Sequence, residues 1–176
     1  EARTSTGREE GIFAWLSVSE QLRRTLGAVI PDNLSVMDMG GASVQLITAV
    51  DATQNNNTND YVDINFHGKK QTLFVHSFLG LGQTLVSDQF LDEPTCFPEG
   101  YLLPDGSLGK GDAMACVNHV SKLIDGVHGV KNVLHLALNQ EKVKTWYVIE
   151  GLAYLAKEAP FNQNKNYYVL SFLISS

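Results

Sequence analysis

The sequence has little of what marks membrane-spanning or nucleic-acid-binding proteins. No apolar run approaches the roughly 20 residues needed to cross a bilayer, and the run at residues 170–174 is short and interrupted by Ser171. Lys and Arg number 13 against 19 Asp and Glu, so the net charge is −6 and there is no excess of basic residues for nucleic acid or anionic lipid. We therefore predict no membrane span in this chain and no nucleic-acid partner.

Cysteine is also scarce, with only Cys96 and Cys116 in the chain. Cys96 lies in a loop-rich stretch beside two prolines, which favours a disulfide over two free thiols. Closing a ring of about 20 residues would stabilise the fold by about 3 kcal/mol. A disulfide implies an exported protein, whether secreted, periplasmic or extracellular. Two thiols without a CxxC pair do not predict zinc.

The length of 176 residues and the 44% hydrophobic content are typical of one globular domain, which we take to span residues 1–176. The chain opens without Met, and residues 167–174 read as a buried strand close to the end. We therefore expect a lobe or mature fragment of a larger protein.

Hydrophobic periodicity and turn residues predict the order of elements. We expect a helix at 9–26, a strand, Gly-Gly turn and strand over 34–50, a polar loop at 54–60, a strand–turn–strand unit over 61–78, helices at 83–91 and 112–127, a strand at 133–138 and a helix at 144–157. This order favours a ribonuclease H-like α/β lobe, with a mixed sheet and helices on its faces.

A few single residues are predicted to have structural roles. Phe13, Trp15 and Leu16 are expected in the core, and Arg23 and Arg24 on a solvated helix face. His76 is expected to form a hydrogen bond within the fold near a strand end. The other histidines show no metal-ligand spacing.

The stretch from Asp38 through Gly40, Gly41 and Ser43 to Gln45 is the strongest candidate for chemistry. A carboxylate at a strand end can hold a hydrated divalent cation, and glycines let backbone amides approach phosphate. Strand alternation places Ser43 and Gln45 on one face, where a hydroxyl and an amide can hold one water. The alternative is a plain hairpin with Asp38 as a turn former.

The stretch Thr6-Gly-Arg-Glu9-Glu10-Gly11 is the second candidate. Acidic residues at a helix start usually complement the helix dipole, and Glu9 can complete a capping box with Thr6. Alternatively, one of the two carboxylates is a general base that takes a proton from an attacking water.

Three segments together resemble successive motifs of the nucleoside triphosphate diphosphohydrolases, or apyrases. They are TGREEGIFAW at 6–15, MDMGGASVQ at 37–45 and VHSFLGLG at 75–82, and they follow the family's order and spacing. The family pattern runs roughly G-x-E-E-G-x-x-x-W, D-L-G-G-A-S-x-Q and Y-x-H-S-F-L-x-x-G. The cysteine pair, with its C-F-P-x-G-Y segment, resembles one of the family's disulfides.

The resemblance implies an actin/hexokinase-type lobe of a Ca²⁺- or Mg²⁺-dependent hydrolase of nucleoside tri- and diphosphates. By residue-to-residue match, Glu10 is the general base, and Ser43 and Gln45 position the nucleophilic water. Asp38 matches the residue that holds the metal through water. The second phosphate-binding loop falls on Gly40, Gly41 and Ala42.

The chain also departs from the family pattern. The D-x-G-S-x-x-T phosphate loop of a first lobe and the final family motif are missing, and Gln83 and Thr84 stand where many relatives have a basic residue for base contacts. Tyr147 and Tyr154 are candidates for stacking on a nucleobase, with core packing as the preferred interpretation. A complementary first lobe is thus an implied partner, and the isolated lobe is expected to be weak or inactive.

Two other interpretations remain open at this stage. One is a nucleotide-binding or sensing module of the same fold that does not hydrolyse its ligand. The other is a secreted binding module that has kept the fold and lost activity. The presence of Glu10, Ser43 and Gln45 favours the hydrolase.

Overall fold

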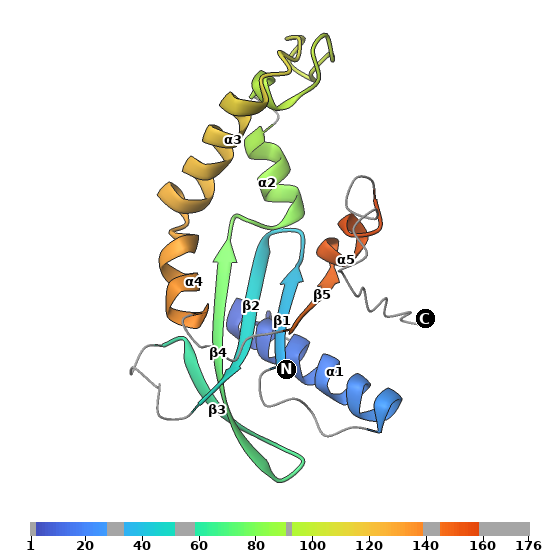
Figure 1. Ribbon diagram of the computed structural model, residues 1–176, viewed down its shortest axis with the longest axis vertical. Coiled ribbons are helices and arrows are strands. Elements are labelled where there is room, and N and C mark those ends of the chain that lie inside the picture. The colour runs from blue at the N-terminus through green and yellow to red at the C-terminus, as the bar shows by residue number, and fades with distance from the viewer. Residues whose placement is uncertain (1–2, 28–33, 52–58, 91–92, 139–144, 159–176) are drawn as a thin grey trace.

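The computed structural model describes residues 3–27, 34–51, 59–90, 93–138 and 145–158 (Figure 1). The predicted strand at 167–174 and most of the polar loop at 54–60 lie outside these ranges. In chain order the elements are α1 (Gly7–Leu26), β1 (Leu34–Met39), β2 (Ser43–Val50), β3 (Tyr61–Phe66), β4 (Lys69–Leu79), α2 (Gln83–Phe90), the 3₁₀ turn η2 (Pro94–Cys96), α3 (Ala113–Ser121), the π-helical segment η3 (Lys122–Val127), α4 (Val130–Leu138), β5 (Thr145–Glu150) and α5 (Gly151–Leu155).

The strands form one five-stranded mixed sheet in the order β3-β4-β2-β1-β5. The pairs β1–β2, β2–β4 and β3–β4 are antiparallel, and β5 runs parallel to β1. Both predicted hairpins are confirmed, one turning at Gly40-Gly41 and the other at His67-Gly68. The predicted mixed α/β architecture is therefore present.

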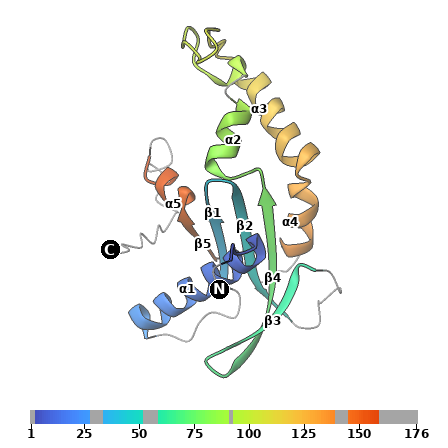
Figure 2. The ribbon, with the colours of Figure 1, turned by 180° about the vertical axis from the view of Figure 1, so that it is seen from behind.

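Helices cover both faces of the sheet, as Figures 1 and 2 show from opposite sides. Successive residues of a strand point to opposite faces, so each strand contributes to two separate cores. On β2, for example, Ile47 joins the core under α1, whereas Leu46 joins the core that α4 contacts on the other face. The site described below lies on the α1 face.

The helix α1 is fixed at both ends and along its buried face. Thr6 and Glu9 form the predicted capping box, and Gly27 ends the helix in the left-handed conformation. Trp15 is 1% exposed and donates from Nε1 to the Leu34 carbonyl at 3.1 Å. The prediction that Phe13 is core is wrong, because it lies on the outer face of the helix and is 60% exposed.

The predicted strand at 133–138 is wrong, since residues 130–138 form the helix α4. The alternation seen from Val133 onward hides a helical pattern that begins earlier, at Val130. Val130, Val133 and Leu134 share one helix face and pack against the core on the side of the sheet away from α1. Gly129, at φ +60°, separates this helix from η3.

The predicted helix at 144–157 is wrong in its first half, which is the strand β5. Its aromatic and β-branched residues suit a strand that is packed on both faces. Trp146 contacts the core on the α4 side, whereas Tyr147 and Ile149 contact the core under α1. Only the short helix α5 follows, beginning at Gly151.

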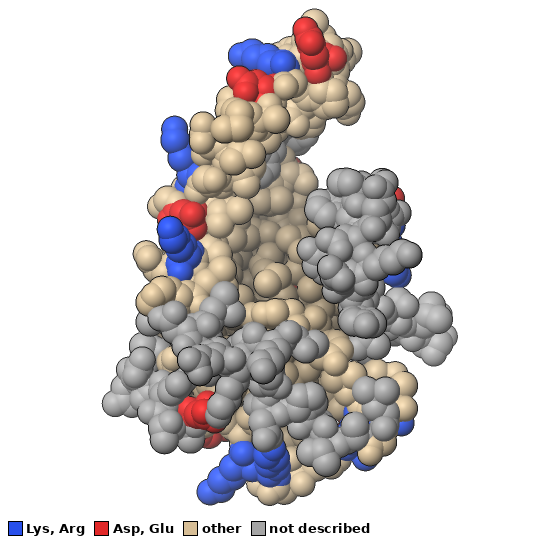
Figure 3. Space-filling model, in the orientation of Figure 1, with Lys and Arg blue, Asp and Glu red and all other residues tan. Residues whose placement is uncertain are grey.

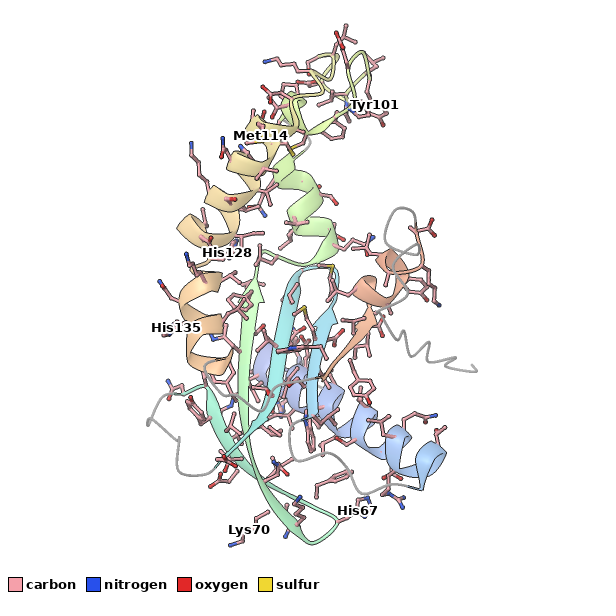
Figure 4. The ribbon with its side chains drawn as sticks, viewed as in Figure 1. His67, Lys70, Tyr101, Met114, His128 and His135 are labelled. Atoms are coloured by element: carbon pink, nitrogen blue, oxygen red, sulfur yellow. A yellow bond between two sulfur atoms is a disulfide. The ribbon has the colours of Figure 1, made fainter. Side chains whose placement is uncertain are left out.

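The helices α2 and α3 form an arm that extends away from the sheet (Figure 1). The predicted disulfide is present, and it joins Cys96 of η2 to Cys116 of α3. Tyr101 and Met114 lie at the far end of this arm in Figure 4, with 52% and 71% exposure. No helix among the described residues is long and apolar enough to cross a membrane.

Loss of the disulfide is expected to destabilise the arm. The bridge closes a ring across a sequence separation of 20, which corresponds to about 3 kcal/mol of unfolding free energy. We therefore expect Cys96→Ala/Cys116→Ala to lower the denaturation midpoint under oxidising conditions and to make it insensitive to reductant. Equal midpoints for the double variant and the oxidised parent would contradict this.

Candidate functional site

Three polar side chains lie in one row across the sheet. In the strand register Asp38 of β1 pairs with Gln45 of β2, and Gln45 pairs with Ser77 of β4. Strand alternation puts all three on the face covered by α1, together with Ser43 two residues before Gln45. The predicted placement of Ser43 and Gln45 on one strand face is therefore confirmed.

The Gln45 side-chain amide joins this row to the helix above it. Gln45 is only 2% exposed, and its Nε2 donates to Glu10 Oε2 at 3.0 Å and to Ser43 Oγ at 2.7 Å. A buried amide needs such partners because leaving it unsatisfied would cost about 1–3 kcal/mol. The structure thus brings Glu10, Ser43 and Gln45 together from two elements.

The two adjacent glutamates of α1 have different partners. Glu9 accepts from the two terminal guanidinium nitrogens of Arg3, Nη1 and Nη2, at 2.9 and 2.6 Å, and from the Thr6 backbone amide at 2.9 Å. Hydrogen bonds from Arg3 and Thr6 lower the pKa of Glu9 to about 2. Glu9 is therefore engaged in the helix cap, and Glu10 is the carboxylate that faces the sheet.

In the turn at residues 40–42 the carbonyls accept hydrogen bonds from within the fold, whereas two of the amides do not donate any among the described residues. The Gly80 amide donates to the Ala42 carbonyl at 2.8 Å, and the amides of Gln83 and Thr84 donate to the Gly40 and Gly41 carbonyls at 2.8 Å each. The amides of Gly41 and Ala42, in contrast, have no hydrogen-bond acceptor within the described part of the chain. Two adjacent donors are therefore available to an anion.

Gly82 makes this arrangement possible, a role that its place in the sequence did not predict. A Cβ at Gly82 would overlap with the backbone of Ala42 and Ser43. The start of α2 can therefore lie directly on the turn only because residue 82 has no side chain. Ser77, beside Gln45, was also missed. The β2–β4 register would have identified it.

Asp38 is a largely buried carboxylate that has no cationic partner among the described residues. Its Oδ1 is buried and has no hydrogen-bond partner among the described residues. Burial, then the negative charges of Glu150 and Glu10, raise the pKa of Asp38 to about 6. A divalent cation would relieve all of these costs, so the site fits one.

The described residues do not supply a complete metal cage. They contain no group of three or more His, Cys, Asp or Glu side chains that could hold a metal ion. His67 lies at the β3–β4 hairpin, and His128 and His135 lie along the edge formed by η3 and α4 (Figure 4). A single carboxylate is consistent with Mg²⁺ or Ca²⁺ that keeps waters and binds phosphate oxygens.

The two tyrosines considered for base stacking do not share a location. Tyr147 belongs to β5 and is half-buried against the core under α1. Tyr154 belongs to α5 and is 69% exposed. His76, as predicted, bonds within the fold, with Nδ1 3.0 Å from Asp60 Oδ1.

Charge on the α4 side of the molecule lies away from the middle of the sheet. In Figure 3 the coloured side chains gather at the arm, along the helical edge and at the β3–β4 hairpin, where Lys70 lies in Figure 4. Between these regions the described surface is tan, which marks residues other than Lys, Arg, Asp and Glu. The carboxylates of the candidate site belong to the opposite, α1-covered side.

Replacing Gly82 should test how tightly α2 packs on the turn. Gly82→Ala would force the backbone of residues 42–43 to move, which we expect to cost about 1–3 kcal/mol of unfolding free energy. Gly40→Ala is the matched control, because a Cβ there meets only the Ser43 carbonyl at 3.8 Å. Urea unfolding of both variants measures the difference. Equal midpoints would refute the packing argument.

The buried carboxylate of Asp38 should make stability fall with rising pH. Its pKa is about 6 in the folded protein and 3.8 ordinarily, so between these values the folded state binds more protons than the unfolded one. The Asp38 contribution to unfolding free energy therefore decreases from about pH 4 to about pH 6. In metal-free buffer we expect Asp38→Asn to be more stable than the parent above this range and equal to it below.

Asp105 provides the control, because its pKa is shifted in the opposite direction to that of Asp38. A hydrogen bond from the Ser107 amide lowers the pKa of Asp105. Asp105→Asn should therefore lose stability at neutral pH rather than gain it, as measured by urea unfolding across the same pH series. Destabilisation by Asp38→Asn at neutral pH would contradict the assignment of Asp38 as a buried, repelled charge.

Three proteins of known name are similar to part of this chain. Ectonucleoside triphosphate diphosphohydrolase 3 of Mus musculus is 28% identical over 121 residues, covering 57% of this chain and 23% of the relative. Apyrase 1 of Arabidopsis thaliana is 36% identical over 84 residues, covering 43% and 18%. A guanosine-diphosphatase of Schizosaccharomyces pombe is 32% identical over 80 residues, covering 43% and 14%.

These matches cover about a quarter or less of the relatives' own length. The family model of nucleoside phosphatases matches residues 1–93, which include α1, the turn at residues 40–42 and all of α2. That match covers more than half of the 176 residues. The chain therefore belongs to the GDA1/CD39 (nucleoside phosphatase) family.

Proposed function

We propose that the complete protein hydrolyses nucleoside tri- and diphosphates to the monophosphate and inorganic phosphate. The observation that carries this proposal is the buried Gln45 amide, which joins the Glu10 carboxylate and the Ser43 hydroxyl beside a turn with two available amides. The similarity to ectonucleoside triphosphate diphosphohydrolases and an apyrase supports the nucleotide substrate.

In this mechanism Glu10 is the general base. A water attacks the terminal phosphorus as Glu10 takes one of its protons, and the bond from phosphorus to the leaving phosphate oxygen breaks. The leaving group departs as the shortened nucleotide and takes up a proton from the site or solvent. No covalent bond to the protein forms. A general base of this kind contributes about 10²–10⁴-fold to the rate.

Gln45 and Ser43 position the water for that step. Gln45 fixes the orientation of Glu10 by donating to Oε2, and Ser43 accepts from the same amide. Because the Ser43 oxygen accepts this hydrogen bond, its own proton is left to donate to a water. Holding the water in line with the phosphorus is one of the two main contributions of a protein to phosphoryl transfer, the other being stabilisation of the charge.

The phosphate is bound by the turn at residues 40–42, through the amides of Gly41 and Ala42. Asp38 would hold Mg²⁺ or Ca²⁺ through water, with phosphate oxygens completing the coordination. The bound cation would neutralise negative charge on the phosphate chain. The orphaned Oδ1 of Asp38 is the structural observation that supports this role.

We further propose that the chain is the second lobe of a two-lobed enzyme that works outside the cytosol. The short coverage of the relatives supports the first part, since about three quarters of their length has no counterpart here. The Cys96–Cys116 disulfide supports an oxidising compartment, as does the prefix "ecto" in the relatives' names. The isolated lobe should then be weak or inactive.

The two adjacent glutamates provide the decisive test. In the complete protein we expect Glu10→Gln to lower kcat by about 10³-fold with each active nucleotide, because the general base is lost. Glu9→Gln is the matched control, which should weaken the helix cap at Thr6 and keep kcat within about threefold. Phosphate release from ATP, ADP and GTP with Mg²⁺ or Ca²⁺ measures both.

The contrary outcomes are distinct. A complete protein that binds nucleotide and cation but releases no phosphate is a binding or sensing module, and the proposal is wrong. If Glu9→Gln and Glu10→Gln lower kcat equally, hydrolysis stands but Glu10 is not the base.

A further inference from the structure

Gly7, Ser77 and Gln45 meet beneath the first turn of α1. A Cβ built on Gly7 would overlap with Ser77 Oγ and would lie 2.8 Å from Ser77 Cβ and 3.7 Å from Gln45 Nε2. Ser77 Oγ is itself 3.5 Å from Gln45 Nε2. The helix backbone, the β4 hydroxyl and the buried amide therefore occupy one small volume without space for another carbon.

One turn later the helix makes a second close approach. A Cβ on Gly11 would lie 2.9 Å from Val75 Cγ1 and 3.2 Å from Ile47 Cγ1. Gly7 and Gly11 are four residues apart, so they share one helix face. The absence of side chains at both positions lets α1 rest directly on β2 and β4.

We propose that Ser77 is a positioning residue for the hydrolytic site, setting with Gly7 the height at which α1 holds the Glu10 carboxylate over the Gln45 amide. This inference rests on the proposed function. Ser77 acts on the side chain of Gln45 and on the position of α1 above the sheet. It contacts neither water nor phosphate in this role.

The helix transmits the position of Gly7 to Glu10. The two residues are within one turn of α1, which is a rigid unit capped at Thr6. Lifting the first turn would lengthen the 3.0 Å bond from Gln45 Nε2 to Glu10 Oε2. Misplacing a reacting group by about 1 Å can cost about 100-fold in rate.

The test is a double-mutant cycle in the complete protein. Gly7→Ala is expected to lower kcat by about 100-fold, with the KM for ATP unchanged within about threefold, because the carboxylate moves and the phosphate site does not. In a Ser77→Gly background, where Oγ and Cβ are both removed, Gly7→Ala should cost less than about threefold. Ser77→Ala alone should lower kcat by about tenfold.

Ser35→Ala is the matched control. Ser35 is a buried serine of the same sheet, whereas Ser77 is half-buried, and the Ser35 hydroxyl is 2.7 Å from Thr48 Oγ1. Its loss should lower the unfolding midpoint and leave kcat unchanged. The side-chain amide resonances of Gln45 in an NMR spectrum should shift in Ser77→Ala and stay in place in Ser35→Ala.

Two outcomes would overturn the inference. One is a kcat of Ser77→Ala equal to the parent's, together with unmoved Gln45 resonances. The other is an equal cost of Gly7→Ala in both backgrounds, and if Gly7→Ala fails to fold, the Ser77→Ala measurements decide alone. A parent that releases no phosphate would refute the proposed function instead, and the Gln45 resonances would still test the positioning.

Discussion

The buried amide of Gln45 is the constraint on which the arrangement of the site depends. It comes from a central strand and is 2% exposed, so its two hydrogens must find acceptors within the fold. It finds them in a helix carboxylate and a strand hydroxyl, which ties α1 to β2 at one point. A polar bond across a helix–sheet interface specifies the position of the helix more narrowly than apolar packing does.

Close backbone approach makes that bond possible. Gly7 and Gly11 seat α1 on the sheet, and Gly82 seats the start of α2 on the turn at residues 40–42. All three glycines lie within the conspicuous sequence motifs, and none of them has a positive φ. These positions therefore require glycine because a Cβ would not fit, and not because the backbone needs conformational freedom. The motifs mark the places where α1 packs on the sheet and α2 packs on the turn.

Much of this fold could be predicted because its patterns are local. The capping box of α1, the Gly-Gly turn and the alternation of Ser43 with Gln45 depend on neighbours within a few residues. The errors arose where tertiary contacts decided the structure. Residues 145–150 form a strand because β1 pairs with them in parallel, and Phe13 is exposed because Trp15 and Ala14 occupy the sheet-facing side of α1.

The site could be predicted only in part for the same reason. Glu9 and Glu10 are indistinguishable as residue types, and they separate in the structure because Arg3 and Thr6 engage the first while Gln45 engages the second. Ser77 gains its place from the β2–β4 register, which sequence spacing alone does not define. Residues that act by filling a volume are harder to recognise than residues that act by their charge.

The charges of the site oppose the folded state. Asp38 is repelled by Glu150 and Glu10, and its buried oxygen has no partner among the described residues. Glu150 also stands at φ +53°, a left-handed conformation that is unfavourable for a residue with a side chain. Folding alone would favour neutral groups here. Asp38 and Glu150 therefore reduce the stability of the cation-free protein. Their negative charges suit a protein that binds a cation here.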